Sequence, residues 1–113
     1  MNTPEEAIKY IWEHSDEYAK AKAGRVYLEQ FRKSKKAMLV QEAETKGLKT
    51  AQERESYAYA HDEYLEVLKG LEAAVQVEES LRFKIEALKV RVEVWKTKQM
   101  TKCAEMKLAP LQR

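Results

Sequence analysis

The sequence predicts an all-α protein, a long antiparallel helical hairpin with a short N-terminal helix, and it favours an oligomer. The chain has three Gly and two Pro in 113 residues, too few turn-forming residues for a protein of many strands. Ala, Glu, Lys and Leu, which lose little side-chain freedom in a helix, are abundant. Apolar residues recur at helical spacing along most of the chain, so we expect one helical domain over residues 1–113.

A short first helix is predicted over residues 4–14. Thr3 stands at the cap, Pro4 at the first helical position and a glutamate at the third, which is a capping box with the favoured proline. The polar segment 14–16 then predicts a break, because its serine or its aspartate can cap the next helix.

The second helix is predicted over residues 16–46. Gly24 lies inside it and marks either a bend or a close approach of another helix. The basic last turn followed by Gly47 is the usual stop signal of a helix. The apolar stripe of this helix consists of Ala21, Leu28, Phe31, Met38 and Leu39.

A long third helix is predicted over residues 51–106, with a tail at 107–113. A second capping box begins at Thr50, and apolar residues then recur in a heptad pattern. Glu78 is the one charged residue in this pattern, and Arg82 lies four residues later, where the two can pair. The heptad positions are Tyr57, Tyr64, Leu71, Glu78, Ile85 and Val92, with Ala60, Val67, Ala74, Leu81, Leu88 and Trp95 three residues after each.

A helix of that length buries its apolar side against the second helix, against another subunit, or against both. A continuous helix over 51–106 would be about 75–80 Å long, which exceeds a compact domain of this size. We therefore expect the heptad positions to support self-association. The residues predicted for this role are Tyr64, Leu71, Leu81, Ile85, Leu88, Val92 and Trp95.

The composition also excludes several classes of protein. No apolar run of the length of a membrane span occurs, and the acidic N-terminal residues do not resemble a secretion signal. One cysteine cannot form an internal disulfide, and with two histidines it does not give the ligand spacing of a metal site. We expect a cytoplasmic protein without a bound metal or cofactor.

No pattern of an active site is present. His61 and Asp62 are neighbours, but adjacent residues on a helix do not converge on one point. Cys103 stands in a basic segment that can lower a thiol pKa, yet no histidine is near it in sequence. Phosphate-binding glycine loops and nucleophile elbows are missing, so we do not expect an enzyme.

Basic residues gather between residues 32 and 54, where seven Lys and Arg stand against three Glu. A row of cations along a helix can follow the phosphates of a nucleic acid, and Tyr57 and Tyr59 can stack on unpaired bases. The alternative is a solvated face that pairs with Glu42, Glu44 and the acidic residues of 62–79, and Tyr57 also fits a packed position. The residues predicted to bind nucleic acid are Arg32, Lys35, Lys36, Lys46, Lys49 and Arg54.

A second basic run lies near the end of the long helix. Its cations complement the negative end of the helix dipole, which is a structural explanation. A nucleic-acid surface shared between subunits is the alternative. The run consists of Lys84, Lys89, Arg91, Lys96, Lys98 and Lys102.

Residues 27–57 resemble the central part of the UvsY family, the recombination mediators of T-even phages. The shared features are a lysine pair, an apolar pair, a Glu-Ala pair and a closing lysine, here Lys35, Lys36, Met38, Leu39, Glu42, Ala43 and Lys46. Lys49 and Arg54 before Tyr57 look like a similar run in the family, with a small difference in length. This chain is shorter than the family and lacks a clear match to its C-terminal assembly region.

The resemblance implies a helical oligomer, in the family a closed ring, that binds single-stranded DNA without hydrolysing nucleotides. It implies that Lys35, Lys36 and Lys46 contact DNA, and less directly Lys49 and Arg54. It further implies a RecA-like recombinase or a single-strand binding protein as partner, in the cytoplasm of a bacterial host cell. Two other functions stay open: a helical adaptor or inhibitor from a mobile element that binds protein only, and a structural coiled-coil component.

Overall fold

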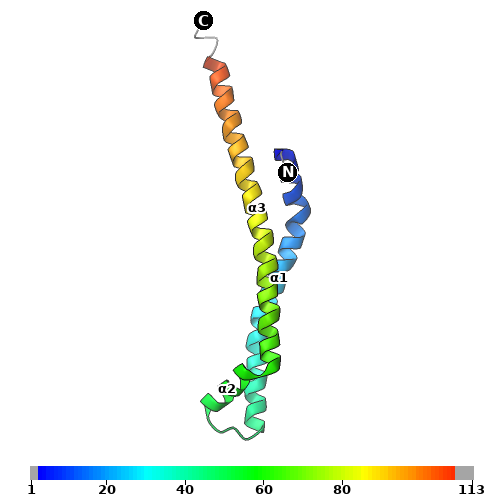
Figure 1. Ribbon diagram of the computed structural model, residues 1–113, viewed down its shortest axis with the longest axis vertical. Coiled ribbons are helices and arrows are strands. Elements are labelled where there is room, and N and C mark those ends of the chain that lie inside the picture. The colour runs from blue at the N-terminus through cyan, green and yellow to red at the C-terminus, as the bar shows by residue number, and fades with distance from the viewer. Residues whose placement is uncertain (1–2, 109–113) are drawn as a thin grey trace. The chain divides into compact units, whose positions relative to one another are not determined.

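The computed structural model describes residues 3–108, which form three helices and, within that range, no strand. They are α1 (Pro4–Thr45), α2 (Ala51–Ala60) and α3 (Asp62–Leu108) (Figure 1). The prediction of an all-α protein made of a long helix pair and a short helix is confirmed. None of the three helices has the length and apolar character needed to cross a membrane.

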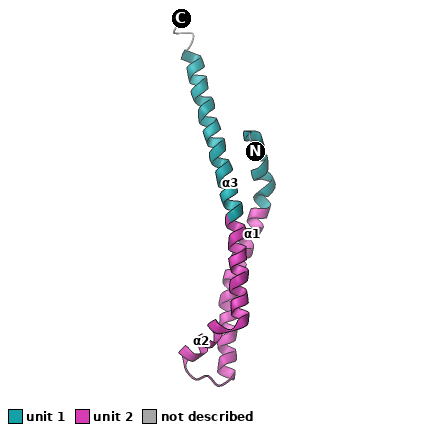
Figure 2. Ribbon diagram, in the orientation of Figure 1, with its two compact units in different colours: residues 1–16, 80–113 teal, residues 17–79 magenta. Residues whose placement is uncertain are grey.

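The described chain divides into two compact units (Figure 2). Unit 1 contains residues 3–16, which include the first part of α1, with 80–108 of α3, and unit 2 contains residues 17–79. Within unit 2, α1 and α3 are antiparallel, because Arg25 contacts Glu78 whereas Lys35, further along α1, contacts the earlier Glu63. Within unit 1, side chains from both helices line the same hollows on the surface.

α1 begins where the capping residues predict, since the Thr3 hydroxyl accepts a hydrogen bond from the backbone N–H of Glu6 at 3.2 Å. The predicted break at 14–16 is wrong, and α1 continues through it. His14 bonds through Nδ1 to the Tyr10 carbonyl at 2.9 Å, and the Ser15 hydroxyl donates to the Trp12 carbonyl at 3.0 Å. These side chains bond back to the preceding turn and therefore do not cap a new helix.

α1 ends after Thr45 at the predicted stop. Gly47 has a φ of 95°, and its N–H donates to the Glu44 carbonyl at 3.0 Å. The N–H of Leu48 donates to the Ala43 carbonyl at 3.1 Å, which completes a Schellman motif. The close helix approach considered for Gly24 is absent, because no atom of a neighbouring element lies within 4 Å of an added Cβ there.

The predicted single helix over 51–106 is divided at His61. α2 starts at the predicted cap, where Thr50 accepts a hydrogen bond from the N–H of Glu53 at 3.1 Å. His61 is extended, and its Nδ1 accepts a hydrogen bond from the N–H of Glu63 at 3.1 Å, so it caps α3. α3 reaches Leu108, two residues beyond the predicted end, and residues 109–113 of the predicted tail lie outside the described range.

The heptad positions of α3 named above form an inner seam that is largely covered within one chain. In unit 2, Tyr64 packs in a cluster with Leu39 of α1 and Ala58 of α2. In unit 1, the inner seam supplies three buried side chains, Leu81, Ile85 and Leu88. Leu71 and Val92 are half-buried, and Trp95 is exposed.

Glu78, the charged member of the inner seam, is 5% exposed and pairs with Arg25 of α1. The predicted pairing with Arg82 is replaced, and Arg82 instead bonds to Glu86 at 3.2 Å. The Arg25 guanidinium donates to both oxygens of Glu78 and to Glu29 at 2.9 Å. These bonds, the one to Glu78 first, raise the pKa of Arg25 further above its usual range.

Candidate nucleic-acid interface

All of the residues predicted to bind nucleic acid lie in unit 2. Arg32, Lys35 and Lys36 stand on α1, and Arg54 stands on α2. Lys46 and Lys49 belong to the connection between these helices. The cations are therefore grouped around one reversal of the chain.

Lys35 is already paired with a carboxylate. Its Nζ lies 2.8 Å from Oε2 of Glu63 in the first turn of α3. The Lys35 ammonium lowers the pKa of Glu63 below its ordinary value, since the charge and the hydrogen bond both favour the carboxylate. This contact is one of the acidic pairings that the alternative explanation of the basic cluster expects.

Two further lysines, Lys36 and Lys46, each contact a tyrosine ring and a carboxylate. Lys36 Nζ lies 4.7 Å from the ring centroid of Tyr59 and 3.7 Å from Glu55. Contact with Tyr59 is the first cause that raises the pKa of Lys36. Tyr59 itself is 46% exposed, so its ring is accessible from solvent.

Lys46, in the connection between α1 and α2, also lies against a tyrosine and a carboxylate. Its Nζ lies 5.2 Å from the ring centroid of Tyr57 and 3.7 Å from Glu42. Contact with Tyr57 is the first cause that raises the pKa of Lys46. Tyr57 is half-buried and also meets the His61 ring edge to face, with centroids 5.6 Å apart.

The remaining predicted cations differ in their surroundings. Arg54 makes a hydrogen bond within the fold. Its Nε donates to the Leu48 carbonyl at 2.8 Å and so connects α2 to the preceding loop. Within residues 3–108, no ion pair is found for Arg32, which is half-buried, or for the exposed Lys49.

The ion pairs do not by themselves prevent a phosphate from binding. The partner carboxylates Glu42, Glu55 and Glu63 have side chains that are 43%, 56% and 55% exposed. Because these carboxylates are exposed to water, the ion pairs contribute little stability, and a dense row of phosphates can replace them. The surface is thus a set of partly neutralised cations with two tyrosines among them.

Sequence reasoning anticipated Glu42 and the acidic segment 62–79 as partners and missed Glu55. Glu55 reaches Lys36 because α2 folds back beside α1, which the helix break at His61 allows. A signal for that break was present in the acidic first turn after His61, since acidic residues favour helix starts.

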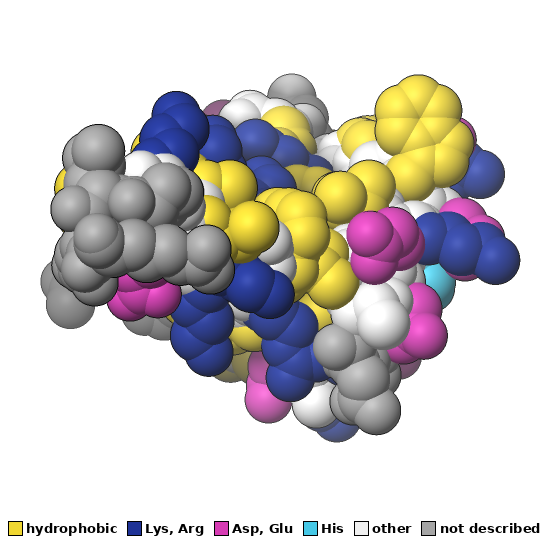
Figure 3. Space-filling model, turned by 90° about the horizontal axis from the view of Figure 1, so that it is seen from above, with side chains coloured by type: hydrophobic (Ala, Val, Ile, Leu, Met, Phe, Trp, Pro, Cys, Tyr) yellow, Lys and Arg dark blue, Asp and Glu magenta, His cyan; other side chains and the backbone are white. Residues whose placement is uncertain are grey.

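The second basic run lies in unit 1, and its lysines are more exposed than those of the first basic cluster at Lys35 and Lys36. Lys84, Lys89 and Lys98 are exposed, and in the described part of α3 no carboxylate pairs with them. The end view in Figure 3 shows Lys and Arg side chains beside hydrophobic ones on one surface. No group of metal-binding side chains is found over residues 3–108, and Cys103 is exposed.

Comparison of the chain with protein-family models, with curated proteins and with solved structures finds no match.

Proposed function

We propose that the chain is a non-enzymatic accessory protein of phage-type DNA recombination or replication. It binds single-stranded DNA through the basic surface of unit 2 and acts beside a RecA-like recombinase or a single-strand binding protein in the cytoplasm. Its copies self-associate, so that several basic surfaces act on one strand.

The observation that carries this proposal is the placement of lysines of the α1 end against tyrosines of α2. Lys36 with Tyr59 and Lys46 with Tyr57 put two cation and aromatic pairs on one reversal of the chain. Unpaired bases stack on aromatic rings while cations neutralise the flanking phosphates, which is how proteins bind single strands without sequence preference. The resemblance of Lys35, Lys36 and Lys46 to the UvsY pattern supports the same ligand.

Self-association supports function because one such surface binds weakly. Three of its lysines must exchange a carboxylate for a phosphate. Several surfaces in one assembly act at a high effective concentration, so overall affinity exceeds that of each surface by orders of magnitude. Strong salt dependence is then expected.

The test is a fluorescence titration of a labelled single-stranded oligonucleotide at several salt concentrations. Lys35→Ala with Lys36→Ala should weaken binding to all sequences alike and reduce the salt slope by roughly 0.7 for each lost phosphate contact. The matched control is Lys20→Ala with Lys22→Ala, which removes the same charge from an exposed part of α1.

Equal losses in the two double variants would show that only net charge matters. No measurable affinity of the wild-type chain at low salt would refute the proposal outright. Preserved affinity in the Lys35 and Lys36 double variant would also refute the assignment of the site.

A protein-binding adaptor is the second candidate, and exposed aromatic residues favour it. Trp12 is 82% exposed on α1, and Trp95 is exposed on α3, both in unit 1. Tryptophan is among the residues most enriched at the energetic centres of protein interfaces. An adaptor would show no affinity for the oligonucleotide and a tight complex with a purified protein partner.

A further inference from the structure

α3 carries a second heptad pattern that its own chain does not cover. From Ser80 onward, small or apolar residues recur in alternating steps of three and four residues, the spacing of a coiled-coil seam. Each of them is exposed, with Phe83 at 61%, Val90 at 62% and Val94 at 48%. This outer seam consists of Ser80, Phe83, Ala87, Val90, Val94, Thr97, Thr101, Ala104 and Leu108.

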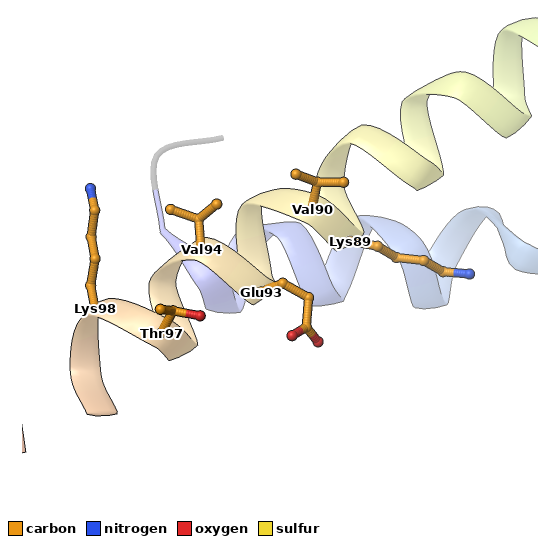
Figure 4. A pocket seen from close by; sticks show the side chains of 6 residues that line it. All are labelled: Lys89, Val90, Glu93, Val94, Thr97 and Lys98. Carbon is orange, nitrogen blue, oxygen red and sulfur yellow. The ribbon is translucent and has the colours of Figure 1, made fainter. Parts of the chain in front are cut away.

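The outer seam lies on a different side of α3 from the inner seam. At 100° per residue, the outer-seam residues are centred roughly 160° from Leu81, Ile85 and Leu88. The centre of the outer seam is a hollow lined by α3 residues alone, with Val90 and Val94 pointing to the same side of the helix (Figure 4). No α1 residue lines this hollow, although Tyr10 and Pro4 of α1 line neighbouring hollows with Ala87 and Val94.

Charged residues flank the central part of the outer seam, residues 86–98, in a regular way. With Ala87 and Val94 at position a, the following e positions are Arg91 and Lys98, and the preceding g positions are Glu86 and Glu93. One side of the seam is thus basic and the other acidic over two successive heptads. Residues at e and g set the partner and the orientation of a coiled coil.

We propose that the outer seam pairs α3 with α3 of a second copy in a parallel, two-stranded coiled coil. In parallel helices a g residue meets the e residue of the next heptad on the partner, so Glu86 meets Arg91 and Glu93 meets Lys98. An antiparallel pair would place e against e and g against g, with like charges facing each other. The charge pattern thus selects both a copy of this chain and its orientation.

This pairing is the interface through which the self-association in the proposed function would occur. It rests on the proposed function only in requiring that copies of the chain associate. The inner seam is already covered by its own chain at Leu81, Ile85 and Leu88, so a second copy requires different side chains. Glu86 also contacts Arg82 at 3.2 Å within its helix. Its side chain is 55% exposed and keeps room for a cation of the partner.

The test uses two charge-reversed variants and their mixture, with mass measured by light scattering. Glu86→Lys with Glu93→Lys makes both flanks basic, and Arg91→Glu with Lys98→Glu makes both acidic. Each variant alone should give a smaller mass than the wild-type assembly. Mixed one to one, the two should recover that mass, because g and e are again complementary.

The control is Lys96→Glu with Lys102→Glu, which changes the same charge at exposed positions of α3 outside the outer seam and its hollow, and should leave the mass unchanged. Circular dichroism confirms that each variant stays helical. The proposal is overturned if the wild-type chain is monomeric at micromolar concentrations, if helical reversed variants keep their mass alone, or if mixing them does not restore it.

Orientation is tested independently by cysteine cross-linking. Identical d positions face each other in a parallel pair, so Ala104→Cys in a Cys103→Ser background should form a covalent dimer on mild oxidation. The native Cys103, one position outside the seam, should cross-link far less. Equal cross-linking of both would contradict the parallel seam, while oligonucleotide binding by unit 2 would remain a separate measurement.

Discussion

Arg25 and Glu78 form the most deeply placed ion pair in the described part of the chain, and they connect α1 to α3 within unit 2. A buried pair of this kind adds little net stability compared with apolar residues, because both charges lose their water. Removing one partner is costly, since the other charge stays buried. We infer that the pair fixes the register of the two helices more than it strengthens them.

Arg25→Met should therefore lower the melting temperature by roughly 5 °C or more, because it leaves the Glu78 carboxylate without its guanidinium. Arg25→Met with Glu78→Leu should recover most of the loss. Thermal unfolding followed by circular dichroism measures both. A double variant that is less stable than the single one would contradict the statement that the pair adds little net stability compared with apolar residues.

Glu63 gives a pH-dependent prediction. Lys35 lowers the pKa of Glu63 from its ordinary 4.5. A carboxyl with a lowered folded-state pKa stabilises the fold above its unfolded-state pKa and loses that contribution as pH falls through the folded-state value. The wild-type chain should exceed Glu63→Gln in free energy of unfolding at pH 7, and the difference should shrink below pH 4.5.

Urea unfolding of both proteins across this range measures the effect. Glu66→Gln is the control, because it removes an exposed carboxylate on the same helix for which no ion pair is found in the described residues. A difference between wild type and Glu63→Gln that stays constant with pH would rule out the Lys35 contact in solution.

Two glycines of α1 and its C-terminal cap test how the backbone conformation and the packing of the helix affect stability. Gly47 has a φ of 95°, a conformation that costs other residues about 1–2 kcal/mol. Gly24 lies within α1, and no neighbouring element lies within 4 Å of an added Cβ. Gly47→Ala should therefore destabilise the protein, whereas Gly24→Ala should stabilise it by up to about 1 kcal/mol.

Chemical denaturation of these two variants checks the helix boundaries directly. A Gly24→Ala variant less stable than the wild type would mean that α1 is bent or closely packed at Gly24. A neutral Gly47→Ala would mean that the Schellman motif does not end α1.

His61 gives an element-scale prediction at the break between α2 and α3. Its ring accepts the N–H of Glu63, so His61→Ala should cost about 1 kcal/mol as the loss of a helix cap. His61→Asn keeps an acceptor at the cap and should retain most of the stability. Equal losses in both variants would place the role of His61 in its ring contacts instead.

Most helix ends were predictable from sequence because capping is local. Thr3, Gly47 and Thr50 act through bonds to residues a few positions away. The break at His61 was missed because histidine is not among the usual capping residues. The break at 14–16 was wrongly predicted because a polar side chain inside a helix can bond to its own preceding turn.

Fewer features of the candidate site than of the helix ends could be predicted from the sequence. The predicted cations do gather at one reversal of the chain, but their partners depend on packing between helices. Arg25 pairs with Glu78 across 53 positions, and no helical spacing reveals such a contact. Glu55 meets Lys36 only because α2 folds back.

At the scale of the whole molecule, the two units have different chemistry. Unit 2 holds the cations and tyrosines proposed for single-stranded DNA. Unit 1 holds the outer seam proposed for a second copy. Binding and assembly should therefore be separable, so variants of the outer seam should weaken DNA binding chiefly through lost multivalency.

The proposed function requires that the chain assembles and that the assembly binds single-stranded DNA. Size-exclusion chromatography with light scattering, run with and without a labelled oligonucleotide, tests both parts in one measurement. We predict a mass above that of the 13.2 kDa chain alone, and a shift of the label into the protein peak at low salt. A monomer whose peak never carries the label would contradict the proposed function.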